Sequence, residues 1–173
     1  MFKCWKKGNV GIINALGTGV ADDKAVYSYV NKMIVYYLGE QPILNQVETF
    51  LCEDKVHRQH VIENISKLVV KPANASGGYG IMIGPKAPKK EREEVIKKIK
   101  KNPRDFVAQP LEILSTTPTI SENGIEPRHL DLRPFILSGK STYVTTGGLT
   151  RVALRKGSTI VNSSQGGGSK DTM

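Results

Sequence analysis

One lysine followed by a run of glycines is the part of this sequence that points most directly to chemistry. The stretch Leu68–Gly84 reads as an apolar strand ending at Lys71, a loop of small residues, and a second apolar strand. Glycines let backbone N–H groups approach a phosphate without a side chain between them. A lysine at the end of a buried strand needs an anion close by. The pattern predicts a site for a nucleoside triphosphate, and a structural salt bridge of Lys71 is the alternative.

This loop is not one of the familiar phosphate-binding motifs. It lacks the Gly-x-x-x-x-Gly-Lys-Ser/Thr pattern, and it does not open a helix as a dinucleotide-binding fingerprint does. A phosphate would therefore have to be held by a hairpin loop that folds over the nucleotide.

Three charged residues in the second half of the chain form another candidate group. Asp131 and Arg133 lie two residues apart on one predicted strand, so their side chains share a face, and Arg151 lies on a neighbouring strand. Two guanidinium groups placed in this way can neutralise a transferring phosphoryl group or an acyl phosphate. An internal ion pair is the alternative that the sequence leaves open.

Other reactive side chains do not combine into a site. His129 is interpreted as structural, and Cys52, His57 and His60 lack a fourth zinc ligand at a suitable spacing. No Ser–His–Asp or Cys–His arrangement stands out.

Helices and strands must position these residues. Helices are predicted over residues 24–37, 53–66 and 88–101, the first capped by Asp22 or Asp23 and stopped by Gly39. Besides the two strands around the glycine loop, strands are predicted over residues 8–15, 106–110, 130–137, 142–146, 150–154 and 159–161. The last four form an antiparallel meander, followed by a second glycine loop at residues 163–169. The fold class is therefore α+β, with antiparallel sheets flanked by helices.

Composition narrows the class of protein. The chain has 173 residues, 39% of them hydrophobic, which is enough for one domain with a core. No apolar run is long enough to span a membrane, no secretory signal follows the first charges, and two cysteines fit a reducing compartment, so we expect a cytoplasmic protein without a membrane partner. The net charge of +9 comes largely from residues 86–104, and no aromatic residues alternate with these lysines. Nucleic-acid binding is therefore the least favoured interpretation.

Six pieces of sequence, in one consistent order, resemble the circularly permuted ATP-grasp ligases of type 2. These pieces are Asn14–Ala25, Val69–Pro72 with Ser76–Gly80, Ala108–Pro110, Arg128–Phe135, Gly147–Ala153 and Asn162–Gly168. The resemblance implies a partial ATP-grasp domain over residues 1–173. Its parts are a strand and helices leading into the nucleotide-binding subdomain (1–66), the lysine and glycine-loop hairpin region (67–110), and an antiparallel meander with arginines and a terminal glycine loop (111–173).

The resemblance also implies roles for the nucleotide-binding residues. Lys24 and Lys71 would contact phosphates, Lys71 would also touch the adenine edge, and Gln109 would line the adenine slot. The mobile loop over the β- and γ-phosphates would comprise Ser76, Gly77, Gly78, Tyr79 and Gly80.

Catalytic roles are implied for the second half of the chain. Arg133 and Arg151 would hold the γ-phosphate and an acyl-phosphate intermediate, with Asp131 orienting the guanidinium group. The loop that closes on substrate would include Asn162, Gly166 and Gly167. We accordingly expect Lys71, Arg133 and Arg151 to converge around one triphosphate.

The implied activity is that of an ATP-dependent carboxylate–amine ligase, of the peptide-forming type, with ATP and Mg²⁺ as cofactors. Its partners would be a small carboxylate and an amine or peptide. The Glu-x-Asn motif with which this family holds magnesium is not found in a suitable place, and it is expected upstream of Met1. We therefore expect an excerpt or a truncated gene product that pairs with the missing half of the fold or with a second copy. The alternative is an inactive remnant that serves as a nucleotide- or protein-binding module.

Overall fold

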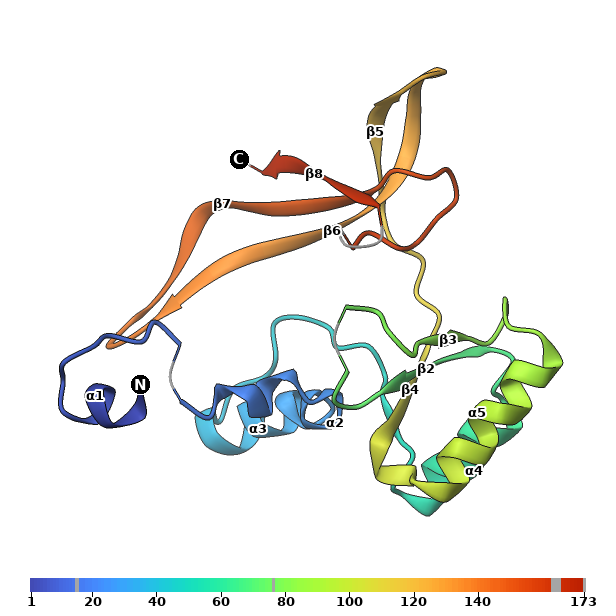
Figure 1. Cartoon of the computed structure of the whole chain (residues 1–173), viewed down its shortest axis with the longest axis horizontal. Helices are drawn as coiled ribbons and strands as arrows, with labels where there is room; N and C mark the ends of the chain where they lie inside the picture. The colour runs from blue at the N-terminus through green and yellow to red at the C-terminus, as the bar shows by residue number, and fades with distance from the viewer. Residues whose placement is uncertain (15, 76, 163–165, 173) are drawn as a thin grey trace. The chain divides into compact units, whose positions relative to one another are not determined.

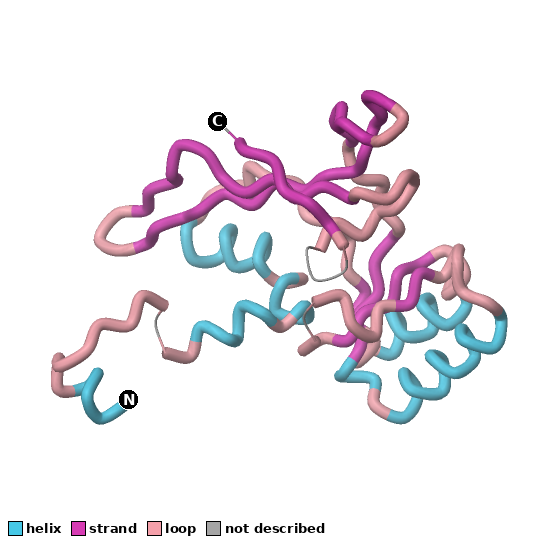
Figure 2. Tube along the Cα trace, turned by 45° about the horizontal axis from the view of Figure 1, so that its top comes forward, coloured by secondary structure: helices cyan, strands magenta, loops and turns pink. Residues whose placement is uncertain are grey.

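The computed structural model describes residues 1–173 except 15, 76, 163–165 and 173. The chain forms two compact units, Met1–Leu111 and Glu112–Met173. Figures 1 and 2 show that helices belong to the first unit and that the second is built from strands and loops. None of the described helices has the length and apolarity needed to cross a membrane.

The first unit contains a small antiparallel sheet covered on one face by two helices. Its four strands lie in the order β1 (Phe50–Leu51), β4 (Phe106–Pro110), β2 (Leu68–Pro72) and β3 (Met82–Ile83). The helices α4 (Lys55–Glu63) and α5 (Lys89–Lys101) lie side by side against this sheet (Figures 1 and 2). The strand–loop–strand prediction around the glycine loop is therefore confirmed.

Alternation along the strands decides which residues form the core. Leu68 and Val70 of β2 point to the helices, where they pack with Val61 of α4 and Ile99 of α5. The narrow apolar stripe of α5 is enough to hold this helix, because its other faces carry charged side chains in solvent. Lys71 lies one residue out of phase with Val70, so its side chain leaves from the opposite face of the sheet.

The remaining helices of the first unit precede this sheet. They are α1 (Phe2–Lys6), the 3₁₀ helix η1 (Thr18–Asp22), α2 (Lys24–Tyr27) and α3 (Val30–Leu38), and the 3₁₀ helix η2 (Pro103–Asp105) leads into β4. The helix predicted over residues 24–37 is interrupted between α2 and α3, where Ser28 Oγ donates to the carbonyl oxygen of Ala25 at 2.8 Å. Gly39 ends α3 in a left-handed conformation, as predicted.

The strand predicted over residues 8–15 is wrong for residues 8–14, and Ala15 lies outside the described residues. Residues 8–14 form turns and irregular backbone, with Ile13 fully exposed. Apolar residues favour a strand only where a partner strand can take up their backbone hydrogen bonds, and no described strand pairs with this segment.

The second unit is an antiparallel meander, as predicted. Its strands follow the order β5 (Thr116–Ser121), β6 (Gly124–Ser138), β7 (Thr142–Ala153) and β8 (Gly167–Thr172). The pieces predicted at 142–146 and 150–154 are parts of the one long strand β7. Together with the two sheets of the chain, this confirms the α+β class with antiparallel sheets flanked by helices.

The end of the meander differs from the prediction. Residues 159–161 do not form a strand, and β8 instead pairs with β7, with Gly167 opposite Ala153. A Cβ atom on Gly167 would lie 2.3 Å from the carbonyl oxygen of Val161. Glycine at this position therefore lets residues 161–162 pass close to the new edge strand. The predicted second glycine loop is thus partly strand, and residues 163–165 lie outside the described part.

Candidate nucleotide-binding site

The start of α2 is tied to the loop that follows β2. Asp23 caps α2 by accepting a hydrogen bond from the backbone N–H of Ala25 at 2.8 Å, and it also pairs with Arg104 Nη2 at 2.7 Å. The backbone N–H of Lys24 donates to the carbonyl oxygen of Ala73 at 3.0 Å. The guanidinium of Arg104 holds the pKa of Asp23 below its usual range, so this anchor stays charged at neutral pH.

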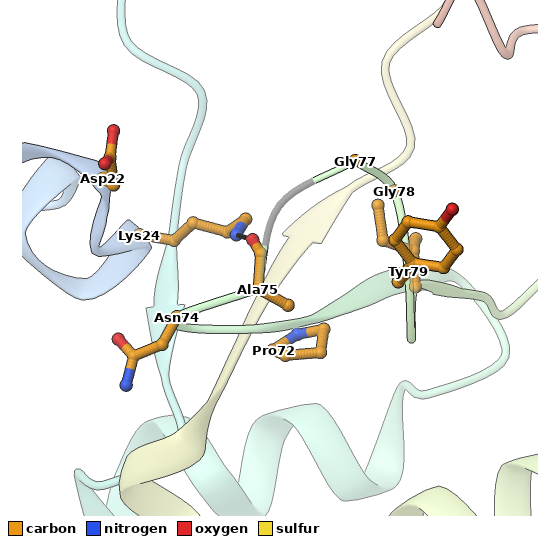
Figure 3. A pocket seen from close by; sticks show the side chains of 9 residues that line it. Asp22, Lys24, Pro72, Asn74, Ala75, Gly77, Gly78 and Tyr79 are labelled. Carbon is orange, nitrogen blue, oxygen red and sulfur yellow. Dashed lines mark hydrogen bonds between the residues drawn. The ribbon is translucent and has the colours of Figure 1, made fainter. Parts of the chain in front are cut away.

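A cavity of about 420 Å³ lies between this helix start and the glycine loop. Figure 3 shows the Lys24 side chain reaching across to the loop, where its Nζ donates to the carbonyl oxygen of Ala75. The lining residues come from both segments: Asp22, Lys24, Pro72, Asn74, Ala75, Gly77, Gly78, Tyr79 and Ile81.

The glycines of this loop adopt backbone conformations that other residues avoid. Gly77, Gly78 and Gly80 have φ angles of +70°, +81° and +72°. A Cβ on Gly80 would also lie 2.9 Å from Cγ of Pro72, so a larger residue would push the loop away from β2. Tyr79 is 70% exposed at the tip. The loop therefore offers backbone and one exposed aromatic ring to a ligand.

Lys71 brings a second ammonium group to this region. Its Nζ donates to Gln109 Oε1 at 2.5 Å, and Gln109 Nε2 donates to Thr49 Oγ1 at 2.8 Å. Burial lowers the pKa of Lys71, and the positive charge of Lys24 lowers it further. In the described part of the chain, neither lysine forms an ion pair with an Asp or Glu side chain. Two neighbouring cations with no carboxylate partner form a site suited to an anion.

The charged residues of the second unit form an ion-pair cluster. Asp131 of β6 lies opposite Arg151 of β7, whose Nε donates to Asp131 Oδ1 at 2.8 Å and whose Nη2 donates to the other oxygen. Arg133 Nε lies 3.9 Å from Asp131 Oδ2, and its side chain is 55% exposed. Hydrogen bonds from Arg151 lower the pKa of Asp131 and raise that of Arg151. The internal ion pair that the sequence left open is therefore present, and Arg133 is the more accessible of the two arginines.

The predicted closing loop is described only in part. The backbone N–H of Gly167 donates to the carbonyl oxygen of Asn162 at 3.0 Å, and Gly166 has a φ of +81°. Gly167 belongs to β8, so at this residue the predicted loop is strand.

The predicted site residues thus fall into two groups. Lys24, Gly77, Gly78 and Tyr79 line one cavity, Gly80 adjoins it through Pro72, and Lys71 with Gln109 lies near Lys24. The other group, in the second unit, comprises Asp131, Arg133, Arg151, Asn162, Gly166 and Gly167. Ser76 lies outside the described residues. The meeting of both groups around one triphosphate stays a prediction.

The cavity does not supply a magnesium site by itself. Of the described residues that line it, only Asp22 carries a carboxylate, and no cluster of three or more His, Cys, Asp or Glu side chains suited to a metal occurs within the described ranges. Magnesium in nucleotide sites is held by one or two carboxylates together with phosphate oxygens and water. The described residues therefore offer at most one protein ligand to such an ion.

Comparison with known proteins matches the sequence of this chain to a family. The family described as circularly permuted ATP-grasp type 2 matches residues 1–153. The chain belongs to the circularly permuted ATP-grasp type 2 family. The resemblance to this family that the sequence predicted is therefore confirmed, and the role of the lysine-and-glycine hairpin in binding a nucleotide stays a prediction.

Three relatives of this ATP-grasp chain are much longer than the chain itself. It is 53% identical to an uncharacterized protein of Synechocystis sp., over 99% of the chain and 36% of that protein. It is 52% identical to an uncharacterized protein of Mycobacterium tuberculosis, over 96% of the chain and 30% of that protein. It is also 52% identical, over 94% of its length, to 19% of a Frankia casuarinae protein named "Putative glutamate--cysteine ligase 2-2". The chain thus spans about a third or less of the length of these relatives.

Some residues of this region were not predicted as site residues from the sequence. Asp22 and Asn74 line the cavity, and Thr49 accepts the hydrogen bond from Gln109. Asp22 lies within the segment Asn14–Ala25 and Asn74 within the stretch Leu68–Gly84, both of which the sequence analysis singled out. Thr49 lies on the same face as Gln109 through the pairing of β1 with β4, and no signal in the sequence fixes that pairing.

Proposed function

We propose that this chain is the ATP-binding part of a carboxylate–amine ligase that works through an acyl-phosphate intermediate. The observation that carries the proposal is a cavity lined by Lys24 and a glycine loop, with a second ammonium group, that of Lys71, close enough to Lys24 to feel its charge. A triphosphate supplies the negative charge that these ammonium groups lack within the described protein. Its binding would also restore the pKa of Lys71, which burial and Lys24 lower.

The loop and the two lysines would divide the work of binding. Backbone N–H groups at Gly77, Gly78 and Gly80 would surround phosphate oxygens, while Lys24 and Lys71 would neutralise their charge. Tyr79 would cover the outer side of the ligand. Because little covalent chemistry falls to the protein in phosphoryl transfer, positioning and charge neutralisation would carry the catalysis.

The reaction would have two steps. A substrate carboxylate oxygen attacks the γ-phosphorus of ATP. The bond between this phosphorus and ADP breaks, ADP leaves, and the carboxylate becomes an acyl phosphate. An amine then attacks the acyl carbon, inorganic phosphate leaves, and the amine loses a proton as the amide forms. Asp22 is the one described cavity residue that could help to hold Mg²⁺, which would neutralise charge on the phosphates. Arg133 would contact the transferring phosphoryl group, and Asp131 would hold Arg151 in a fixed orientation next to it.

The substrates would be a small carboxylate and an amine or peptide, in the cytoplasm. The name of the Frankia casuarinae relative, which describes a ligase joining two amino acids, supports this class. The remaining ligands of the magnesium ion would come from the rest of a longer protein or from a second copy of the chain.

A second candidate is a module that binds nucleotide or a protein partner without catalysis. The observation that favours it is that Asp22 supplies the single carboxylate among the described residues that line the cavity. The two candidates share the ATP site and differ in turnover.

One set of assays separates them. ATP affinity is measured by titration calorimetry with and without Mg²⁺ for the wild type, Lys71→Ala and the matched surface control Lys97→Ala on α5. We expect Lys71→Ala to weaken binding by about 10- to 100-fold, since it removes a charged hydrogen-bond donor, and Lys97→Ala to change nothing. Equal affinity of wild type and Lys71→Ala would refute the site.

Turnover is measured as ADP released with mixtures of amino acids as carboxylate and amine donors. ADP that appears only when both donors are present supports the ligase. If ATP binds but ADP formation never exceeds the background, the ligase is refuted and the binding module without catalysis is supported.

A further inference from the structure

The hydroxyl of Thr49 ends a chain of hydrogen bonds that begins at the Lys71 ammonium. Lys71 Nζ donates to Gln109 Oε1 at 2.5 Å, and Gln109 Nε2 donates to Thr49 Oγ1 at 2.8 Å. Thr49 Oγ1 donates in turn to the carbonyl oxygen of Val47 at 3.0 Å. Lys71, Gln109 and Thr49 are all half-buried, so these bonds are partly shielded from water.

The sheet register explains why these side chains form a row. In the pairing of β2 with β4, Val69 lies opposite Gln109 and Lys71 opposite Val107, so Lys71 and Gln109 are diagonal neighbours on one face. In the pairing of β1 with β4, Phe50 lies opposite Ala108. The same register, carried one residue further, places Thr49 opposite Gln109. The row is therefore built into the pairing of three strands.

The direction of each bond is set at both ends of the row, because the Lys71 ammonium can only donate. The hydroxyl hydrogen of Thr49 points to the carbonyl oxygen of Val47, which leaves the hydroxyl oxygen as an acceptor. Gln109 must then turn its NH₂ group toward Thr49 and its oxygen toward Lys71. The flipped amide would place its NH₂ group next to the Lys71 ammonium and its oxygen next to the hydroxyl oxygen of Thr49, and both contacts are unfavourable.

We propose that Thr49 is a positioning residue for the phosphate-binding lysine: it fixes the Gln109 amide with its oxygen toward Lys71 and so holds the Lys71 ammonium at the anion site. That the anion is ATP rests on the proposed function. The fixed orientation itself rests only on the hydrogen bonds of the free protein.

The first test needs no nucleotide. The side-chain resonances of Lys71 are followed by NMR as a function of pH in the wild type, Thr49→Val and Thr49→Ser. Thr49→Val keeps the shape of the side chain but removes the acceptor, so Gln109 can turn away and the ammonium loses a hydrogen-bond acceptor. We expect a lower pKa of Lys71 in Thr49→Val and a wild-type value in Thr49→Ser.

A matched control is provided by Thr119 of β5. Its Oγ1 also donates to a carbonyl oxygen two residues earlier, that of Thr117. Among the described residues, no glutamine donates a hydrogen bond to Thr119. Thr119→Val should leave the titration of Lys71 unchanged. If Thr49→Val does not fold, Gln109→Leu removes the residue that lies between Lys71 and Thr49 in the row of hydrogen bonds. This variant should also lower the pKa of Lys71.

The second test measures ATP affinity. Loss of one hydrogen bond that orients Lys71 should weaken binding about fivefold in Thr49→Val, with recovery in Thr49→Ser. A Lys71 titration that is identical in wild type and Thr49→Val overturns the inference, whatever the ATP affinity. A wild-type protein that does not bind ATP overturns the proposed function instead, and the titration still decides the role of Thr49.

Discussion

Replacing Gln109 by glutamate should abolish tight ATP binding while it leaves the fold intact. The substitution turns the acceptor that lies 2.5 Å from Lys71 Nζ into a carboxylate of nearly identical shape. Lys71 then acquires a permanent negative partner within the protein. An incoming phosphate must compete with that partner, and the net positive charge of the site falls by one.

The magnitude follows from the hydrogen bonds involved. A hydrogen bond to a charged group contributes about 1.5–3 kcal/mol, so displacing the carboxylate should weaken ATP binding by roughly 10- to 150-fold. The stability of the fold should change little. The gain of about 1 kcal/mol from charging the bond to Lys71 is offset by a similar loss where the second carboxylate oxygen meets Thr49 Oγ1.

The assay pairs titration calorimetry of ATP with urea unfolding of the first unit. Gln41→Glu is the control, because it adds the same charge at an exposed position that does not line the cavity. We expect the free energy of unfolding to stay within about 1 kcal/mol of the wild-type value in both variants. ATP affinity in Gln109→Glu within twofold of wild type, or an equal loss in Gln41→Glu, would refute the reasoning.

Two further predictions concern the loop and the second unit. Gly80→Ala should destabilise the chain by more than the roughly 1–2 kcal/mol that an alanine in the left-handed conformation costs, because the added Cβ meets Pro72, and it should also weaken ATP binding. Gly39→Ala is the control: Gly39 has a similar φ of +67°, but an added Cβ has no atom within 4 Å. This variant should therefore show only the backbone cost in urea unfolding. Hydrogen bonds from Lys156, Arg128 and Ser121 lower the pKa of Glu126 from 4.5 to about 2. Glu126 therefore stabilises the fold above pH 4.5, and this stabilisation is lost as the pH falls toward 2. The urea midpoint of the wild type should drop across that range, and Glu126→Gln should flatten the drop; parallel curves would contradict this assignment.

Local signals made much of the fold predictable. Asp23 caps α2 with its side chain and Gly39 ends α3, as predicted, and both residues act on backbone next to them in sequence. The strands around the glycine loop were equally clear, since turn residues bound each apolar run.

Features that depend on distant partners were not predictable. Thr159–Val161 has the composition of a strand, yet β8 takes the edge of the sheet with glycines that read as a loop. Only the close approach of Val161 explains why Gly167 and not a β-branched residue occupies that edge. Strand composition is a weak guide where tertiary neighbours decide the pairing.

The site shows the same division. That Lys24 and the glycine loop line one cavity agrees with the sequence prediction, because residue type and spacing mark both segments. Thr49 could not be predicted, because its contact with Gln109 depends on the register between β1 and β4. The Asp131–Arg151 pair was visible as an alternative but not decided, since a strand with alternating charges serves a ligand and an internal ion pair equally well.

The central claim is that the Lys71 ammonium faces a bound phosphate. It is tested most directly by the NMR titration of Lys71 with saturating ATP and, as the matched ligand without phosphates, adenosine. We predict that ATP raises the pKa of Lys71, because a bound phosphate places a negative charge beside the ammonium and offsets the effects of burial and of the Lys24 charge. Adenosine should leave the pKa of Lys71 unchanged. A Lys71 titration that does not move when ATP is bound would contradict the account.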